Sequence, residues 1–223
     1  MELIAQGRAA DVYDAGPGRV LRRYRIAAVD ASREAEVMQY VARAGFPVPA
    51  VYDAQGSDLV MERVEGPTML DALGTKPWRM RPYARLLADL HTRLGRIPAA
   101  PGLRQPMGDG SDLMHLDLHP GNVILSPRGA VVIDWTNASA GPAPADVADT
   151  WLIVACARPD EKAALIGLFQ RRFCRAFVTA AGRDTAREHL HAAFAHRIQD
   201  HNMRPAEIER ARKLVRRETG SAP

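Results

Sequence analysis

The apolar positions of the first sixty residues come in short runs with a period of two, which is typical of β-strands. Gly7 and the Gly/Pro-rich turn at 15–18 separate the first three runs. The expected strands are residues 3–4, 11–13, 19–24, 51–52 and 58–62. This part of the chain is therefore expected to form a β-rich lobe around one helix.

That helix is expected over residues 32–44, because Val37, Tyr40, Val41 and Ala44 recur at helical spacing. Ser32 is the expected N-cap residue, and acidic residues follow it in the first turn. Gly45 ends the helix, since glycine is favoured just after a helix C-terminus. The prolines that follow keep the exit extended.

From residue 66 onward the apolar spacing becomes helical, most clearly over 78–94. A loop is expected over 97–110, short apolar runs fill 113–134, and the rest is helical. Breaks in these last helices are expected near Pro159, Gly182 and Pro205. The pattern predicts an α+β chain with a small β-rich lobe (1–62), a hinge (63–66) and a larger α-helical lobe (67–223).

Composition narrows the class of protein. An apolar fraction of 47% and a charged fraction of 25% indicate a globular chain with a packed core rather than disorder. No apolar run approaches the ~20 residues of a membrane helix, and the N-terminus does not resemble a signal peptide. Cys156 and Cys174 are expected to be reduced core residues. We therefore expect a cytoplasmic protein without a membrane partner.

Polar residues gather in the segment HLDLHPGN at 115–122. Phosphoryl transfer from ATP requires a carboxylate that orients or deprotonates the acceptor hydroxyl, and oxygen ligands for Mg²⁺. Asp117 suits the first task, and Asn122 and Asp134 suit the second. The turn at 126–129 lies between two apolar runs, so we expect a hairpin that brings Asn122 and Asp134 near each other.

With these residues the chain resembles the aminoglycoside phosphotransferase and choline kinase family, which has the bilobal protein-kinase-like fold. His115, Asp117, Asn122 and Asp134 match the family's H-x-D-x-x-x-x-N signature and the strand ending in I-D that follows it. Leu116 stands where the family usually has glycine. The resemblance implies an ATP-dependent phosphotransferase in which His115 holds the catalytic loop. Asp146, in the stretch GPAPADVAD, would brace the same loop.

The resemblance also implies nucleotide-binding residues in the first lobe. The hairpin around Gly7 would cover the nucleotide. Arg22 would stand where the family usually has a lysine, pair with Glu34 and bind the α- and β-phosphates. Main-chain groups of Glu62 and Val64 would face the adenine. Arginine binds phosphate through a planar fork, so its geometry differs from that of lysine.

The charge of the C-terminal region indicates which kinds of acceptor molecule the protein would bind. Residues 151–223 hold fourteen Arg/Lys and eight Asp/Glu, and the resemblance implies that this region forms much of the acceptor pocket. A polycationic aminoglycoside would require an acidic pocket, so the charge favours a neutral or anionic hydroxylated small molecule. Antibiotics, sugars, amino alcohols and nucleoside-like compounds all stay open. The sequence indicates neither the preference for ATP over GTP nor the oligomeric state.

Three other interpretations are open. His115, Asp117 and His119 are spaced as a hydrolase metal cluster could be. The absent lysine and the basic C-terminal region would also suit a non-catalytic kinase-fold protein that binds nucleotide or RNA, although nucleic acid is the less favoured partner. A protein kinase is disfavoured, because the segment from Asp134 to Pro144 is short for a peptide-binding activation segment.

Overall fold

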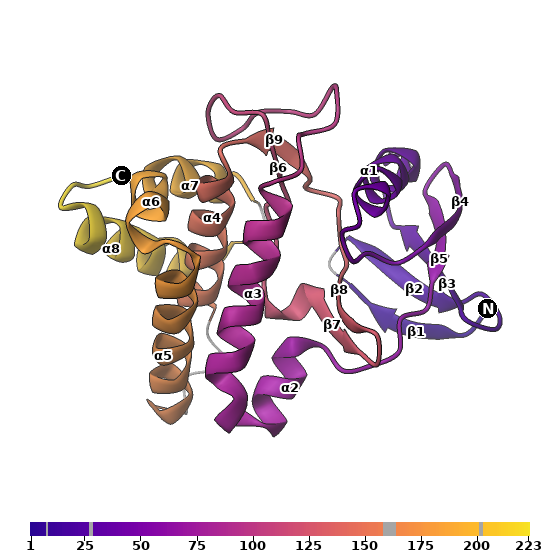
Figure 1. Ribbon diagram of the computed structural model, residues 1–223, viewed down its shortest axis with the longest axis horizontal. Helices are drawn as coiled ribbons and strands as arrows, with labels where there is room; N and C mark the ends of the chain where they lie inside the picture. Colours follow the sequence, from indigo (N-terminus) through magenta and orange to yellow (C-terminus); the bar gives the residue numbers. More distant parts are fainter. Residues whose placement is uncertain (8, 27–28, 158–163, 201–202) are drawn as a thin grey trace. The chain divides into compact units, whose positions relative to one another are not determined.

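The computed structural model describes residues 1–7, 9–26, 29–157, 164–200 and 203–223, so the expected break near Pro159 lies outside the described residues. The chain divides into two compact units (Figure 1). The first unit comprises Met1–Met69 and Gly121–Ala138, and the second comprises Leu70–Pro120 and Ser139–Pro223. Residues 121–138 thus pack with the first unit, whereas the sequence pattern placed everything after residue 66 in one lobe. The hinge at 63–66 stays a prediction.

The first unit is built on a five-stranded antiparallel sheet with the order β1-β2-β3-β5-β4. The strands are β1 (Leu3–Gln6), β2 (Ala10–Asp14), β3 (Arg19–Tyr24), β4 (Val51–Gln55) and β5 (Asp58–Glu62). The central strand β3 has the expected bounds. Its residues Val20, Arg22 and Tyr24 share one face by the two-residue period and are all buried.

The helix of the first unit, α1 (Ala31–Arg43), packs against β4 and β5, and its residues Met38 and Val41 are fully buried. The expected N-cap was wrong: the helix begins one residue earlier, and Asp30 is the N-cap. Its carboxylate accepts the Ser32 N–H at 2.9 Å. A carboxylate at the N-cap also interacts favourably with the helix dipole, which favours Asp30 as the cap of this helix.

A second, two-stranded sheet belongs to the first unit and confirms the expected hairpin. β7 (Val123–Ser126) pairs with β8 (Gly129–Val132) in antiparallel register. The Val132 N–H donates to the Pro47 carbonyl at 2.8 Å, and the Trp135 ring meets the Phe46 ring edge-on, with centroids 5.6 Å apart. These contacts explain why residues 121–138 pack with the first unit.

The second unit is mainly helical. Its helices are α2 (Met69–Thr75, whose first residue belongs to the first unit), a 3-10 turn (Pro77–Arg79), α3 (Met80–Leu94), α4 (Ala143–Cys156), α5 (Ala164–Ala181), α6 (Arg183–Glu188), α7 (Leu190–Arg197) and α8 (Pro205–Thr219). A short strand pair, β6 (Asp112–Met114) and β9 (Ser139–Gly141), completes it. The expected breaks near Gly182 and Pro205 are present. Sequence patterns did not predict β9, because three small residues carry no period.

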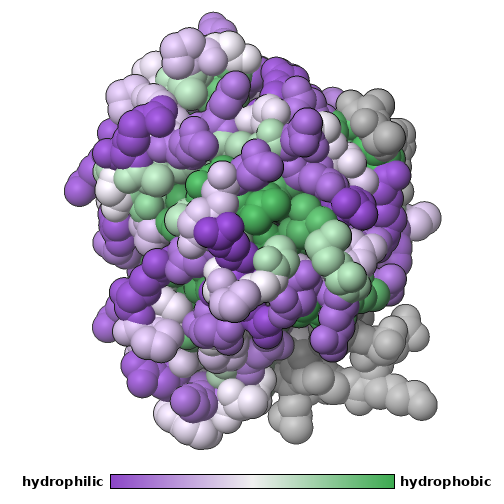
Figure 2. Space-filling view, turned by 90° about the vertical axis from the view of Figure 1, so that its right-hand side faces the viewer, coloured by the Kyte–Doolittle hydropathy of each residue, from purple (hydrophilic) through white to green (hydrophobic). Residues whose placement is uncertain are grey.

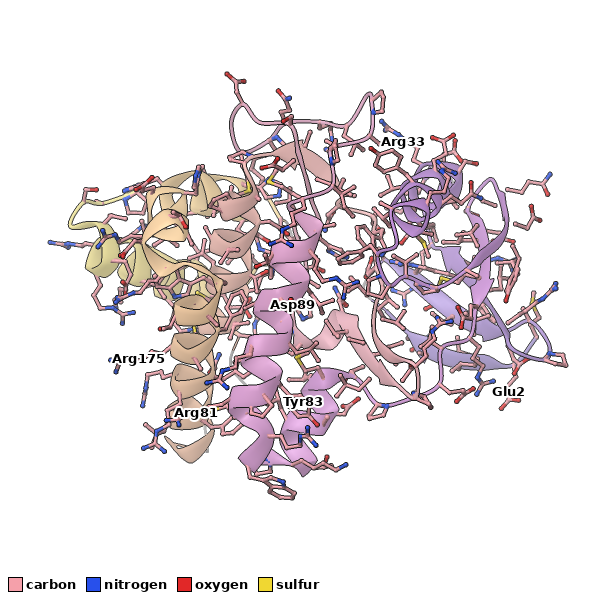
Figure 3. The ribbon with its side chains drawn as sticks, viewed as in Figure 1. Glu2, Arg33, Arg81, Tyr83, Asp89 and Arg175 are labelled. Atoms are coloured by element: carbon pink, nitrogen blue, oxygen red, sulfur yellow. The ribbon has the colours of Figure 1, made fainter. Side chains whose placement is uncertain are left out.

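The core of the second unit lies around α4, which packs against α3, α5, α7 and α8. Tyr83 on α3 is buried, whereas Arg81 and Asp89 on the same helix and Arg175 on α5 are exposed (Figure 3). Cys156 and Cys174 are buried free thiols, as expected, and burial raises the pKa of each to about 12.

Hydrophilic residues cover most of the face in Figure 2, and hydrophobic residues gather near its middle. Among the described residues, no helix has the length and apolar content that a membrane span requires.

Gly66 offers a test of the packing between the β5 exit and the β7–β8 hairpin. Its φ is 139°, and a Cβ at this position would overlap the Leu125 carbonyl. We expect Gly66→Ala to lower the free energy of unfolding by about 2–3 kcal/mol, because left-handed strain and a backbone clash add together. Urea denaturation would measure the change.

The matched control is Gly18→Ala. Gly18 has a φ of 68°, but a Cβ there would meet nothing within 4 Å. This variant should lose about 1 kcal/mol from backbone strain alone. Equal losses of unfolding free energy in Gly66→Ala and Gly18→Ala would contradict the close approach of Gly66 to the Leu125 carbonyl.

Candidate active site

Arg22 joins three parts of the first unit. Its Nη1 lies 2.9 Å from Glu34 Oε1 on α1, which is the pair expected from the sequence. Its Nη2 lies 2.6 Å from Asp134 Oδ1, two residues after β8. The side chains of Arg22 and Glu34 are only 10% and 3% exposed, so this ion pair is largely shielded from solvent. The two carboxylates hold the pKa of Arg22 above its ordinary value despite burial.

Glu34 is compensated by three donors. Besides Arg22, the Tyr24 hydroxyl donates to Oε2 and the Trp135 N–H donates to Oε1 at 2.9 Å. Burial raises the pKa of Glu34, and these donors oppose the rise without cancelling it. Sequence reasoning missed Tyr24, although the two-residue period of β3 places it on the same face as Arg22.

Thr136 completes this cluster, and the sequence carried no signal for it. Its hydroxyl donates to Asp134 Oδ1 at 3.1 Å and lies 2.8 Å from the Tyr24 hydroxyl. Arg22 Nη2 also reaches the Thr136 oxygen at 3.3 Å. The side chain of Asp134 is therefore held from two sides while it stays 38% exposed.

Asn122 and Asp134 flank the two strands of the β7–β8 hairpin. The Ile133 N–H donates to the Asn122 carbonyl at 3.0 Å, which holds the two segments together. Asp134 has a φ of 67°, in the left-handed region that aspartate tolerates better than most residues. Both side chains offer the hard oxygen atoms that Mg²⁺ prefers.

The alternative metal cluster of His115, Asp117 and His119 is not formed. In the part of the chain that the structure describes, no group of three or more His, Cys, Asp or Glu side chains could hold a metal ion. A site at Asn122 and Asp134 would therefore take its remaining ligands from phosphate oxygens and water, as Mg²⁺ sites often do.

The loop at 115–119 lies in the second unit and is held by Asp146 of α4. One oxygen of this buried carboxylate accepts the backbone N–H groups of His115 (3.1 Å) and Leu116 (2.7 Å). The other oxygen lies 3.1 Å from His91 Nδ1 on α3. Burial alone would raise the pKa of Asp146, but His91, His115 and the Leu116 amide lower it below its ordinary value.

The Leu118 carbonyl of the same loop is held as well. It accepts the Thr150 hydroxyl of α4 at 2.8 Å and lies 3.3 Å from His91 Nε2. His91 thus contacts both Asp146 and the loop, and sequence reasoning missed it. The only signal was a histidine on the apolar face of α3.

Leu116 shows why the family usually has glycine at this position. Its φ is 57°, which is left-handed, and its side chain is fully buried. A leucine in this conformation costs roughly 1–2 kcal/mol relative to glycine. Burial of the side chain and the Asp146 hydrogen bond offset that cost.

Asp117 follows on this loop with its side chain 24% exposed. Its Oδ1 lies 3.4 Å from Nη2 of Arg197, the last residue of α7, and its Oδ2 lies 3.8 Å from His119 Nε2. Arg197 was not expected from the sequence, because nothing in a helical arginine indicates which distant loop it reaches.

The predicted adenine-facing residues lie at and after the end of β5. The Glu62 N–H donates to the Ala50 carbonyl at 2.8 Å, so a contact from Glu62 to a base would use its carbonyl. The Glu62 carboxylate is 2.7 Å from Arg128 Nη2 in the β7–β8 turn. Val64 is half-buried. Their role stays a prediction.

Asp146→Asn tests the brace on the 115–119 loop. We expect this variant to lose about 2–3 kcal/mol of unfolding free energy at pH 7, since hydrogen bonds to a charged acceptor are replaced by weaker ones. Folding lowers the pKa of Asp146 from 3.8, so its contribution is present above pH 3.8 and is lost as the pH falls through the folded value.

The difference between wild type and Asp146→Asn, measured by urea denaturation, should therefore narrow as the pH is lowered from 7 to below 3.8. Asp184→Asn is the control, because the side chain of Asp184 is 87% exposed. If the difference in unfolding free energy stayed constant with pH, Asp146 would not stabilise the loop as an ionised carboxylate.

The chain is similar in sequence to a known protein. The chain is 29% identical over 124 residues to a probable serine/threonine-protein kinase BUD32 homolog of Archaeoglobus fulgidus, covering 52% of this chain and 53% of that protein. It thus spans about half the length of this curated relative.

Solved structures with a similar fold include a thermostable variant of the aminoglycoside phosphotransferase APH(4)-Ia in a ternary complex with ADP and hygromycin B. That structure matches with a TM-score of 0.68 and 15% identity over 99% of this chain and 94% of that one. The gentamicin complex of APH(2")-IIa matches with a TM-score of 0.63 and 13% identity over 98% and 89% of the two chains. These likenesses confirm the expected α+β kinase-like fold.

The model of the phosphotransferase enzyme family matches residues 1–112 and 103–191, which is most of the chain. The chain therefore belongs to the phosphotransferase enzyme family and has the kinase-like fold.

Proposed function

We propose that the protein transfers the γ-phosphate of ATP to a hydroxyl of a small molecule. The observation that carries this proposal is the position of Arg22, which is paired within one unit with both Glu34 and Asp134. A cation held in this way, beside a carboxylate suited to Mg²⁺, is what the binding of nucleotide phosphates requires. Structures of similar fold with bound ADP, ATP or AMP-PNP support a nucleotide as the donor.

In the proposed reaction the acceptor oxygen forms a bond to the γ-phosphorus, and the bond from that phosphorus to the β–γ bridging oxygen breaks, which releases ADP. Asp117 orients the acceptor hydroxyl and takes its proton. Arg22 binds the α- and β-phosphates. The loop around Asp117 is pre-organised by Asp146, so little conformational entropy is lost at the moment of reaction.

Asn122 and Asp134 are the residues that would hold Mg²⁺, which when bound neutralises charge on the phosphates. The side chain of Asp134 is partly exposed but is held at one oxygen by Arg22 and Thr136. Asp134 would be available to the cation once Arg22 contacted the phosphates in its place. Glu62 and Val64 would contact the base through main-chain groups.

The acceptor we favour is neutral or anionic, because basic residues exceed acidic ones over 151–223. A hydroxylated antibiotic other than a polycationic aminoglycoside is one such compound. The sequence match to a probable serine/threonine-protein kinase favours a second candidate acceptor, a serine or threonine hydroxyl of a protein.

The first prediction on function concerns Asp117. Purified protein with Mg²⁺ and ATP should release ADP with at least one acceptor from a panel of hydroxylated antibiotics, sugars, nucleosides, amino alcohols and a serine-rich protein. Asp117→Asn should lower turnover by roughly 100- to 10,000-fold, the range typical of general-base catalysis. ATP binding without turnover on any acceptor, together with salt-sensitive RNA binding, would instead indicate the non-catalytic alternative.

The second prediction concerns Arg22. Arg22 contacts Glu34 and Asp134 through two different nitrogens, and the single ammonium group of a lysine cannot reproduce that fork. We expect Arg22→Lys to weaken the binding of ATP with Mg²⁺ about 10-fold, which corresponds to the loss of one charge-assisted hydrogen bond. Isothermal titration calorimetry would measure the affinity.

Arg23→Lys is the matched control, because Arg23 lies next along β3 on the opposite face and pairs with Asp58 at the surface. Its affinity for ATP should stay within about two-fold of wild type, as is usual for exposed ion pairs. Wild-type affinity in Arg22→Lys would argue against a phosphate-binding role for the fork.

A further inference from the structure

The guanidinium of Arg197 is shared between two carboxylates and a backbone carbonyl of the second unit. Nη2 lies 3.4 Å from Asp117 Oδ1, and Nε lies 3.5 Å from Asp149 Oδ1 on α4. Nη1 donates to the Leu116 carbonyl at 3.5 Å. All three nitrogens therefore face acceptors, and two of these acceptors belong to the loop that carries Asp117.

Asp149 is costly to the fold. Its side chain is completely buried, and neither carboxylate oxygen has a hydrogen-bond donor within the described part of the chain. Burial raises the pKa of Asp149 well above its ordinary value, although Arg197 opposes the rise. A buried carboxyl without donors destabilises a protein relative to an apolar residue of similar size. The orientation of Arg197 by Asp149 offers a physical reason for a buried carboxyl at this position.

Asp149 lies on α4 only three residues after Asp146, which holds the amides of the same loop. α4 thus acts on the loop in two ways. Asp146 binds the backbone directly, whereas Asp149 orients Arg197, which in turn contacts Asp117. The side chain of Arg197 is 14% exposed, so its contacts are only weakly screened by solvent.

We infer that Arg197, oriented by the buried Asp149, is a positioning residue that holds the carboxylate of Asp117 and the loop around it in one arrangement. Its contribution to turnover rests on the proposed function, because only there does Asp117 take a proton. The restraint on the loop does not depend on that function. Arg197 therefore contacts Asp117 Oδ1 from α7, whereas His119 approaches Asp117 Oδ2 from within the loop.

Hydrogen exchange tests the restraint without any assay of activity. In Arg197→Met, peptides spanning 115–119 should exchange about 10-fold faster than in wild type, because the loop loses the contacts at Asp117 and Leu116. Peptides from α3 should be unchanged. Arg187→Met is the matched control, since Arg187 on α6 is exposed and pairs with Asp184 at 3.7 Å.

The double variant Arg197→Met/Asp149→Asn removes both charged side chains. It replaces Arg197→Met in the hydrogen-exchange measurement if the single variant does not fold. Unchanged exchange of 115–119 in whichever of the two variants folds would overturn the inference.

Turnover tests the catalytic consequence. With the acceptor found in the panel, or with water as acceptor if ATP hydrolysis is measured alone, Arg197→Met should lower kcat about 100-fold. The KM for ATP should stay within about two-fold, since this interaction acts on the acceptor side of the reaction. Arg197→Lys keeps the charge without the fork and should recover part of the loss.

The coupling of Arg197 with Asp149 is the decisive outcome. Asp149→Asn should lower kcat about 10-fold in wild type and should have almost no further effect in Arg197→Met, because both changes remove one interaction. If the two substitutions lower kcat by factors that multiply in the double variant, then the two residues act separately and the inference is overturned. If Asp117→Asn keeps wild-type turnover, the proposed function fails, whereas the exchange measurement still decides whether Arg197 restrains the loop.

Discussion

Burying a carboxylate is costly unless donors and cations compensate it, and two such compensated carboxylates, one in each unit, connect the segments around them. In the first unit, Glu34 draws together α1, β3 and the segment after β8. In the second, Asp146 draws together α4, α3 and the loop at 115–119. Each carboxylate connects segments that are far apart in the sequence. The polar residues of the candidate site are positioned largely by these two buried acids.

The use of arginine rather than lysine at residue 22 fits this constraint. A lysine offers one nitrogen to its partners, whereas the planar fork of Arg22 reaches Glu34 with one nitrogen and Asp134 with another. The two carboxylates come from an early helix and from the end of a later hairpin. The fork therefore ties the five-stranded sheet and α1 to the segment that follows the β7–β8 hairpin within one unit.

Features that depend on local periodicity were predictable from the sequence. The bounds of β3 and the β7–β8 hairpin follow from strand alternation and turn residues, whereas the pair of Arg22 with Glu34 was implied by the resemblance to the family. The residues that escaped prediction act over long sequence distances. His91, Thr150 and Arg197 reach the 115–119 loop from three different helices, and no local pattern distinguishes them from other helical residues.

The left-handed leucine in the loop at 115–119 makes the effects of substitutions around it depend on one another. Leu116 is tolerable only because its side chain is enclosed and its N–H is already held by Asp146. Without that enclosure, a leucine at this position would strain the loop for no gain. The leucine therefore depends on the residues that enclose it. Leu116 and its surroundings form an epistatic group, and single residues exchanged with relatives at this loop would not transfer independently.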